Sequence, residues 1–323
     1  MGEIENVVIQ AGSCSVMLLP ALGGKVASIR VEGIELLQAP LLPYAPRTQS
    51  MGFAEADASG WDECLPSVAA CQVQSPVGQH SIPDHGDLWR VPWRVVDATA
   101  DSATLTGTCF SLPLELTRTV LLSQTGTSSR LSLIYTVANL ASTPTPWSWA
   151  AHPLFIAQAG DRVHLPASIT SLRLEGSGGN TLGKNGDSVS WPVANLADGS
   201  TDDLSLAKAP ESGRGDNLFS GKLSRVAGED WCTLERPSVG LKITFRFDPD
   251  VTPYLGMWLC YSGWPDGAEN RQQCVALEPA TAPVDSLAEL GPWSLTLAPG
   301  ETCSWPMEIE IEKINEVLED RLA

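Results

Sequence analysis

Three ionisable residues, His85, His152 and Glu278, stand in sequence contexts that packing alone does not require. His85 lies in a turn-like segment between two aspartates, and His152 follows an aromatic, strand-like run and precedes a proline. Glu278 ends an apolar stretch and also precedes a proline. Because carboxyl and imidazole groups can exchange protons near neutral pH, these side chains are candidates for general acid and base catalysis.

Simpler interpretations of these residues stay open at this point. A single histidine is most often a surface residue or a hydrogen-bonded core residue, and His80 and His164 are assigned to that class. Glu278 could form a salt bridge or occupy an exposed sheet edge, because a buried glutamate without a partner is costly. The adjacent acids Asp62 and Glu63 stand in a comparable position, in a segment rich in polar and aromatic residues.

Other reaction classes find little support in the motifs. His85 with a neighbouring aspartate could bind a cation, but no His-x-His or His-x-x-x-His spacing is present, so no metal site is predicted. The Gly-x-Ser-x-Gly elbow of α/β hydrolases is absent. Neither a Gly-x-Gly-x-x-Gly fingerprint nor a complete phosphate loop, with Ser or Thr after Gly-Lys, occurs. Acid–base chemistry without a metal or organic cofactor is the favoured hypothesis.

The elements that must position these groups are mostly strands. Apolar and polar side chains alternate over several segments, which is the pattern of a strand with one buried face. The clearest are Leu241–Phe247, Leu131–Val137 and Met307–Glu312, and further examples are Leu114–Leu122, Val26–Val31 and Trp293–Leu297. With 28 glycines and 24 prolines marking frequent turns, the chain is predicted to be all-β, a single domain over residues 1–323 built as an antiparallel sandwich or barrel. Only Ile314–Leu322 is predicted to be a short helix.

Two long segments, residues 40–88 and 172–218, lack clean alternation. Long irregular segments in a compact domain are usually functional or mobile. The first is rich in polar and aromatic residues and is expected to help build a site. The second contains mostly Gly, Ser, Asn and Asp and is expected to be a surface excursion. Trp61, Trp89 and Trp258 are candidate stacking surfaces for a ring-shaped ligand, although tryptophan more often belongs to the core.

Charge and composition exclude several kinds of partner. The net charge of −18, from 38 acidic and 20 basic residues, disfavours nucleic acid and anionic membrane surfaces. No basic and apolar leader opens the sequence and no apolar run approaches about 18 residues, so neither a secretory signal nor a transmembrane helix is predicted. The eight cysteines include no Cys-x-x-Cys pair, which favours reduced thiols. We therefore expect a cytoplasmic protein that acts on a neutral or weakly charged small molecule, and no oligomeric state is predicted.

Five segments together resemble the aldose 1-epimerase (galactose mutarotase-like) family. They are, in order, Leu18–Ile29, Gly60–Pro66, Asp84–Trp93, His152–Phe155 and Ala276–Pro283, and they span nearly the whole chain. The resemblance implies a large antiparallel β-sandwich, or supersandwich, with a sugar lying across one sheet face. It also implies an isomerase that interconverts the α and β anomers of a sugar by ring opening, without a cofactor.

The family pattern implies a role for each candidate residue. It makes Glu278 the general base at the anomeric hydroxyl, and His152 the acid for the ring oxygen. His85 would assist or orient His152. Asp216 is the best match for the aspartate with which the family binds sugar hydroxyls.

The chain departs from the galactose-specific members in one segment. It has no counterpart of the Asn-Arg-Ile sequence that supplies their sugar-binding arginine, and Gly60–Pro66 stands there instead. Asp62 and Glu63 are therefore candidates for that contact, and Arg90 and Trp258 are further sugar-binding candidates. The identity of the sugar, and whether it is phosphorylated, is not predicted.

Two alternatives to an epimerase are retained. One is a non-catalytic carbohydrate-binding protein on the same fold, although a pure binder does not need an acid and a base together. The other is a glycoside hydrolase or lyase that uses paired carboxylates such as Glu63 and Glu278. Their carboxyl groups would have to lie about 5–9.5 Å apart across the scissile bond.

Overall fold

The computed structural model describes residues 5–75 and 78–314, most of which fold into two large antiparallel sheets. The larger sheet has eleven strands. In spatial order they are β1 (Val7–Ala11), β2 (Cys14–Leu19), β3 (Lys25–Val31), β5 (Trp61–Cys64), β13 (Ala150–Ile156), β23 (Gln273–Ala280), β22 (Tyr254–Tyr261), β19 (Arg214–Ser220), β15 (Ser171–Ser177) and β16 (Ser188–Ser190), with β4 (Ile34–Glu35) paired to β3. Strands β5, β13 and β23 are therefore neighbours although they lie far apart in the sequence.

The smaller sheet has eight strands and shows the predicted alternation. In spatial order they are β14 (Arg162–His164), β20 (Trp231–Arg236), β21 (Leu241–Phe247), β25 (Thr302–Lys313), β11 (Ser128–Asn139), β10 (Leu114–Thr125), β9 (Ser102–Thr108) and β8 (Arg94–Ala98). In β25 the side chains of Met307, Ile309 and Ile311 are buried, whereas Glu308 and Glu310 are partly exposed. The strand predicted at Leu241–Phe247 has the same bounds in the structure.

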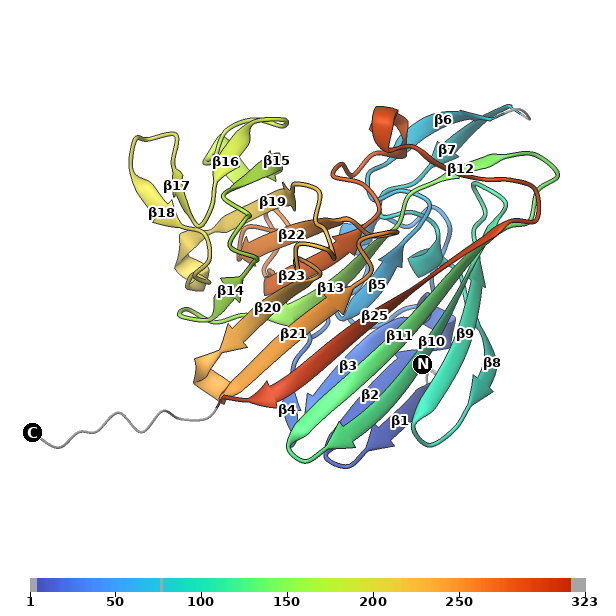
Figure 1. Ribbon diagram of the computed structural model, residues 1–323, viewed down its shortest axis with the longest axis horizontal. Helices are drawn as coiled ribbons and strands as arrows, with labels where there is room; N and C mark the ends of the chain where they lie inside the picture. Colours follow the sequence, from blue (N-terminus) through green and yellow to red (C-terminus); the bar gives the residue numbers. More distant parts are fainter. Residues whose placement is uncertain (1–4, 76–77, 315–323) are drawn as a thin grey trace, which may run out of the picture.

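The core lies between the two sheets, which confirms the predicted antiparallel β-sandwich. Phe155 of β13 packs edge-on against Phe245 of β21, with ring centroids 5.6 Å apart, and this contact joins the two layers. Figure 1 shows β9–β11 and β25 lying across β1–β3. Burying aromatic rings of this size removes a large apolar area from water, which is the main stabilising contribution to such a core.

Smaller elements flank the sandwich. The two-stranded pairs are β6 (Cys71–Ser75) with β7 (Gly78–Ile82), β12 (Thr145–Trp147) with β24 (Leu295–Leu297), and β17 (Val193–Asn195) with β18 (Thr201–Asp203). Short 3₁₀ turns are η1 (Pro20–Leu22), η2 (Phe53–Glu55), η3 (Leu88–Arg90), η4 (Gly178–Asn180), η5 (Pro210–Ser212), η6 (Pro237–Val239), η7 (Leu287–Glu289) and η8 (Gly291–Trp293). Residues 5–75 and 78–314 contain no α-helix and no helix long and apolar enough to cross a membrane. The helix predicted at Ile314–Leu322 lies, apart from its first residue, outside the described residues.

The two long segments differ from their predicted form. Residues 40–88 contain β5, β6 and β7, and residues 172–218 contain most of β15 and β19 and all of β16. The prediction of a surface excursion is wrong for these last three strands, which belong to the larger sheet. Their Ser, Gly, Asn and Asp residues weaken the apolar alternation from which a strand is predicted.

Candidate active site

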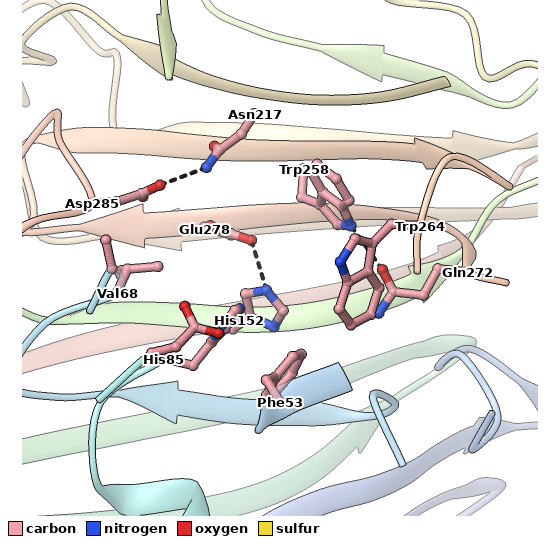
Figure 2. A pocket seen from close by; sticks show the side chains of 12 residues that line it. Phe53, Val68, His85, His152, Asn217, Trp258, Trp264, Gln272, Glu278 and Asp285 are labelled. Atoms are coloured by element: carbon pink, nitrogen blue, oxygen red, sulfur yellow. Dashed lines mark hydrogen bonds and ion pairs between the residues drawn. The ribbon is translucent and has the colours of Figure 1, made fainter. Parts of the chain in front are cut away.

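A cavity of about 270 Å³ lies on the face of the larger sheet that is turned away from the core (Figure 2). Its lining comes from β13, β19, β22 and β23 and from loops that cover them. The lining residues are Phe53, Val68, Ala69, Asp84, His85, His152, Asn217, Trp258, Trp264, Gln272, Glu278 and Asp285. Small-molecule sites usually occupy about 300–1,000 Å³, and this cavity lies just below that range, so it suits one small ligand such as a single sugar ring.

Strand register brings His152 and Glu278 together in this cavity. β13 and β23 are antiparallel neighbours in which Ala150 pairs with Ala280. Continuing this register by two residues places His152 opposite Glu278, with both side chains on the cavity face. His152 Nε2 lies 3.6 Å from Glu278 Oε1, which is close enough for an ion pair but too far for a direct hydrogen bond. The two groups are thus adjacent, and both stay free to contact a ligand.

His85 reaches the same cavity from the turn after β7. Its ring stacks on Phe53 with centroids 3.9 Å apart and lies edge-on to His152 at 5.1 Å. Its Nδ1 is 2.9 Å from Asp84 Oδ2, a contact that keeps a proton on Nδ1 and orients the ring. The backbone of His85 has φ 57°, in the left-handed region that residues with a Cβ seldom adopt, and its N–H donates to the carbonyl of Val68. The three residues predicted to be catalytic therefore lie side by side.

Burial shifts the pKa values of the central pair in opposite directions. It lowers the pKa of His152 well below 6.5, and the electrostatic effects of the nearby His85 and Lys25 side chains act in the same direction. It raises the pKa of Glu278 well above 4.5, and the negative charge of Asp285 adds to this effect. Burial thus favours a neutral pair, in which a single shared proton resides on Glu278 rather than on His152.

Aromatic side chains form one end of the cavity. Trp258, which the sequence predicts as a sugar-binding residue, donates from Nε1 to Gln272 Oε1 at 2.8 Å, and this bond fixes its indole. Trp264 lies beside it, and Figure 2 shows both indoles on the same side of the His152–Glu278 pair. Aromatic faces can pack against the C–H bonds of a ring-shaped ligand while polar groups bind its hydroxyls.

The opposite end of the cavity is polar and was not identified from the sequence. Asn217 Nδ2 donates to Asp285 Oδ2 at 2.8 Å. Four buried polar atoms of the cavity have no hydrogen-bond partner within the described part of the chain: His152 Nδ1, Asn217 Oδ1, Glu278 Oε1 and Asp285 Oδ1. Such atoms are rare in folded proteins, and their concentration here indicates that the cavity is built to hold a polar ligand. No three His, Cys, Asp or Glu residues within 5–75 and 78–314 are grouped so that they could hold a metal ion.

Glu63 lies on the opposite face of the sheet, inside the core. Its carboxylate accepts hydrogen bonds from Arg118 Nη1 at 2.8 Å, Trp149 Nε1 at 3.0 Å and Tyr135 Oη at 3.1 Å. Burial raises the pKa of Glu63 to about 7, although Arg118 and the other donors act to lower it. The prediction that Glu63 contacts a sugar is therefore corrected, and a hydrolase that pairs it with Glu278 loses its structural basis.

Asp62 faces the cavity side of β5, opposite His152 in the strand register, but it does not line the cavity. Lys25 Nζ lies 2.5 Å from Asp62 Oδ2 and 3.1 Å from Asp57 Oδ2, and Arg47 pairs with Asp57. These charges are buried and neutralise one another. Asp62 therefore belongs to this buried network. Its prediction as a direct sugar ligand is corrected, because Asp62 is not among the lining residues of the cavity.

Arg90 is also committed to the protein rather than to the cavity. It donates from Nε to the carbonyl of Met51 at 2.9 Å and from Nη1 to the carbonyl of Asp84 at 2.7 Å. Its guanidinium lies over the ring of Trp89, 4.1 Å from the centroid. Arg90 therefore holds the segment next to His85 in place, which corrects its prediction as a sugar ligand.

Asp216 lies one position from a cavity residue but on the other face of the sheet. Its carboxylate accepts from Ser177 Oγ at 2.6 Å and from Arg214 Nη2 at 2.5 Å. Successive residues of a strand face opposite sides, so Asn217 enters the cavity and Asp216 does not. The prediction that Asp216 is the family's hydroxyl-binding aspartate is therefore corrected, because the residue of this strand that lines the cavity is its neighbour Asn217.

The remaining unpredicted lining residues come from covering loops. They are Phe53, Val68, Ala69, Asp84, Trp264, Gln272 and Asp285. Asp84 and Asp285 had a usable signal, since the first lies in one of the family-like segments and the second follows another by two residues. The others have none, because a loop residue meets a site only through the fold of the whole chain.

The sequence and the fold both match known proteins. Residues 67–310 match the model of the aldose 1-epimerase family. Among solved structures, a protein from Synechocystis sp. PCC 6803 is 18% identical with a TM-score of 0.70, covering 97% of each chain. A galactose mutarotase-like protein from Lactobacillus casei ATCC 334 is 18% identical with a TM-score of 0.68, covering 95% of this chain and 100% of that one. An aldose epimerase homologue from C. elegans is 13% identical with a TM-score of 0.67, covering 96% and 99%. Comparison with curated protein sequences gives no match. Because the family match extends over residues 67–310 of 323, the chain belongs to the aldose 1-epimerase family.

Proposed function

We propose that this protein is an isomerase that interconverts the α and β anomers of a sugar by acid–base ring opening. The observation that carries the proposal is the His152–Glu278 pair, an imidazole and a carboxyl group 3.6 Å apart in a cavity of about 270 Å³. Both reacting oxygens of a cyclic sugar are bonded to the same anomeric carbon. Two neighbouring proton-transfer groups can therefore reach them together.

In the proposed reaction, Glu278 takes the proton of the anomeric hydroxyl. The bond between the anomeric carbon and the ring oxygen then breaks, its electron pair stays on the ring oxygen, and His152 protonates that oxygen. The open aldehyde rotates about its bond to the next carbon, and the reverse proton transfers close the ring on the other face. Each positioned proton transfer contributes about 10²–10⁴-fold to the rate.

The reaction needs one proton on the pair. Burial favours protonated Glu278 with neutral His152, whereas the reaction starts from the carboxylate and the imidazolium. Both states contain one proton in total, so a single transfer within the pair interconverts them. A bound sugar favours the ionised state, because its hydroxyl donates to the carboxylate and its ring oxygen accepts from the imidazolium.

His85 supports the pair in this scheme. It lies edge-on to His152, stacks on Phe53 and is oriented by Asp84. A histidine in this position can help hold His152 in the orientation needed for proton transfer, or it can contact the sugar close to the ring oxygen. We assign it the assisting role, because the closer acid–base distance is the one between His152 and Glu278.

The test is polarimetry on freshly dissolved α-glucose, α-galactose and other aldoses. Glu278→Gln and His152→Asn should each lower the catalysed rate by about 10²–10⁴-fold while sugar affinity is largely kept. His164 and Glu235 offer a matched control, because they form another histidine–carboxylate contact, at 2.7 Å, on the smaller sheet. His164→Asn and Glu235→Gln should leave the rate unchanged. Full activity of either cavity variant would overturn the assigned roles, and sugar binding without any mutarotation by the wild type would favour a carbohydrate-binding protein.

A further inference from the structure

Asn217 and Asp285 form a polar pair that the proton transfers described above do not use. Because Asn217 Nδ2 donates to Asp285 Oδ2 at 2.8 Å, the amide is oriented, and its Oδ1 is left as an acceptor. Asn217 Oδ1 and Asp285 Oδ1 are both buried and have no hydrogen-bond partner in the described part of the chain. Leaving two acceptors unpaired is unfavourable unless a ligand supplies donors.

The pair is held rigidly with respect to the acid–base groups. The backbone carbonyl of Asp285 accepts from the N–H groups of Val68 and Ala69 at 3.0 and 2.9 Å, and Val68 in turn accepts from the N–H of His85. Asn217 lies in β19, within the same sheet as Glu278. Asp285 is also close enough to Glu278 that its negative charge raises the pKa of that carboxyl. A ligand that meets His152 and Glu278 therefore meets this pair in a fixed geometry.

The charges around the cavity limit which ligand can enter. Its described lining contains three carboxyl groups, on Asp84, Glu278 and Asp285, and includes neither lysine nor arginine. Lys25, whose charge reaches His152, is buried and paired with two aspartates. Arg90 donates to backbone carbonyls. A phosphate or carboxylate on the sugar would thus find no lysine or arginine in the lining to pair with, and it would be repelled by Asp84, whose pKa, despite burial, is lowered by its contact with His85.

We propose that Asn217 and Asp285 are the specificity residues of the site, and that they accept hydrogen bonds from two neighbouring hydroxyls of an uncharged aldose. This inference rests on the proposed function, since it takes the ligand to be a sugar whose anomeric carbon lies at His152 and Glu278. Hydroxyl donors match the two free acceptor atoms, one each. Adjacent hydroxyls fit because the acceptors belong to side chains that are hydrogen-bonded to each other.

The experiment compares an aldose with its deoxy analogues and its 6-phosphate. Binding is followed by calorimetry, with the change in intrinsic tryptophan fluorescence, to which the cavity residues Trp258 and Trp264 contribute, as a second readout, and turnover is followed by polarimetry. In the wild type, two deoxy sugars that lack adjacent hydroxyls should bind roughly 10- to 100-fold more weakly than the parent, which is the usual effect of losing a hydrogen bond to a charged or buried acceptor. The 6-phosphate should bind more weakly than the parent sugar.

Substitution should remove this discrimination one hydroxyl at a time. Asp285→Ala should raise KM for the parent sugar roughly 10- to 100-fold, and it should bind one of the two deoxy sugars as well as it binds the parent sugar. Asn217→Ala should have the same two effects, with the other deoxy sugar. Asp285→Asn preserves the shape of the side chain and shows whether charge is needed. Glu289→Gln, which changes an exposed carboxylate in the same loop, is the matched control and should behave as the wild type.

The outcomes separate this inference from the proposed function. Unchanged discrimination in folded Asp285→Ala and Asn217→Ala, with activity that still depends on Glu278, would refute the specificity pair and leave the isomerase intact. Loss of discrimination in binding, without mutarotation by the wild type, would support the pair and refute the isomerase. Preference for the 6-phosphate, or no binding of any sugar by the wild type, would refute the inference.

Discussion

Gly256 lies directly beside Glu278 in the larger sheet, so a side chain at this position would press on the Glu278 carboxyl group. It pairs with Glu278 across β22 and β23 and with Phe219 across β22 and β19. A Cβ atom at this position would lie 3.1 Å from Glu278 Oε2, 3.2 Å from Glu278 Cβ and 3.0 Å from Phe219 Cε1. The added methyl group would thus be wedged between two side chains, and movement away from one would bring it closer to the other.

The size of the effect follows from these distances. Ordinary contacts of a Cβ begin at 3.4 Å, so Glu278 would have to shift by a few tenths of an ångström. A misplacement of about 1 Å can lower a rate about 10²-fold, so we expect Gly256→Ala to lower kcat about 3- to 10-fold. The free energy of unfolding should change by no more than about 1 kcal/mol, because alanine also reduces the entropy of the unfolded chain.

Polarimetry and thermal unfolding of Gly256→Ala test this reasoning together. Gly221→Ala is the matched control, since Gly221 follows β19 and a Cβ there would have nothing within 4 Å. The control should keep both activity and stability. Wild-type kcat in Gly256→Ala would show that the carboxyl group of Glu278 need not occupy its present position, and the reasoning from strand register would fail.

Two further predictions concern charge. The rate should be bell-shaped in pH, falling in acid when the pair gains a second proton, on His152, and in alkali when Glu278 loses the proton that the pair shares. Asp285→Asn removes a negative charge that raises the pKa of Glu278, so the alkaline limb of the pH–rate profile should move to lower pH. An unmoved alkaline limb would contradict this. In the core, Arg118→Met should lower the free energy of unfolding, measured in urea, by about 3–5 kcal/mol because it removes the ion-pair partner of the buried Glu63 carboxylate. That loss should be larger in mildly alkaline than in mildly acidic solution, because removal of Arg118 raises a pKa that burial has already raised to about 7, and a pH-independent loss would argue against it.

The strands could be predicted from the sequence where the alternation is strong and local. Leu241–Phe247 alternates fully and forms β21 with the predicted bounds. Only part of Trp293–Leu297 forms a strand, because Trp293 ends the 3₁₀ turn η8. Polar strands such as β15 and β16 were missed since their neighbours in the sheet, not their composition, hold them there.

The site residues were predictable by type but not by face. Asp62 and Glu63 are consecutive in β5, so they point to opposite sides, and the partners that bury them, Lys25 and Arg118, are distant in sequence. Asp216 and Asn217 show the same difficulty one strand further on. A motif identifies that a charged residue is present, but which face it occupies depends on the pairing of strands, and that pairing is non-local.

One row of the larger sheet explains why the acid and base are placed so closely. In the strand register, Asp62 of β5 lies opposite His152, Glu278 opposite Gly256, and Gly256 opposite Phe219. All five residues therefore share the cavity face. Asp62 is paired with Lys25, so it adds no net charge beside His152 and Glu278. A slip of one residue between β13 and β23 would carry Glu278 to the core face and end the contact with His152. Such a slip would also turn the apolar core residues of β23 toward the cavity and its cavity residues toward the core. The apolar packing of the sandwich therefore fixes the strand register, and with it the distance between His152 and Glu278.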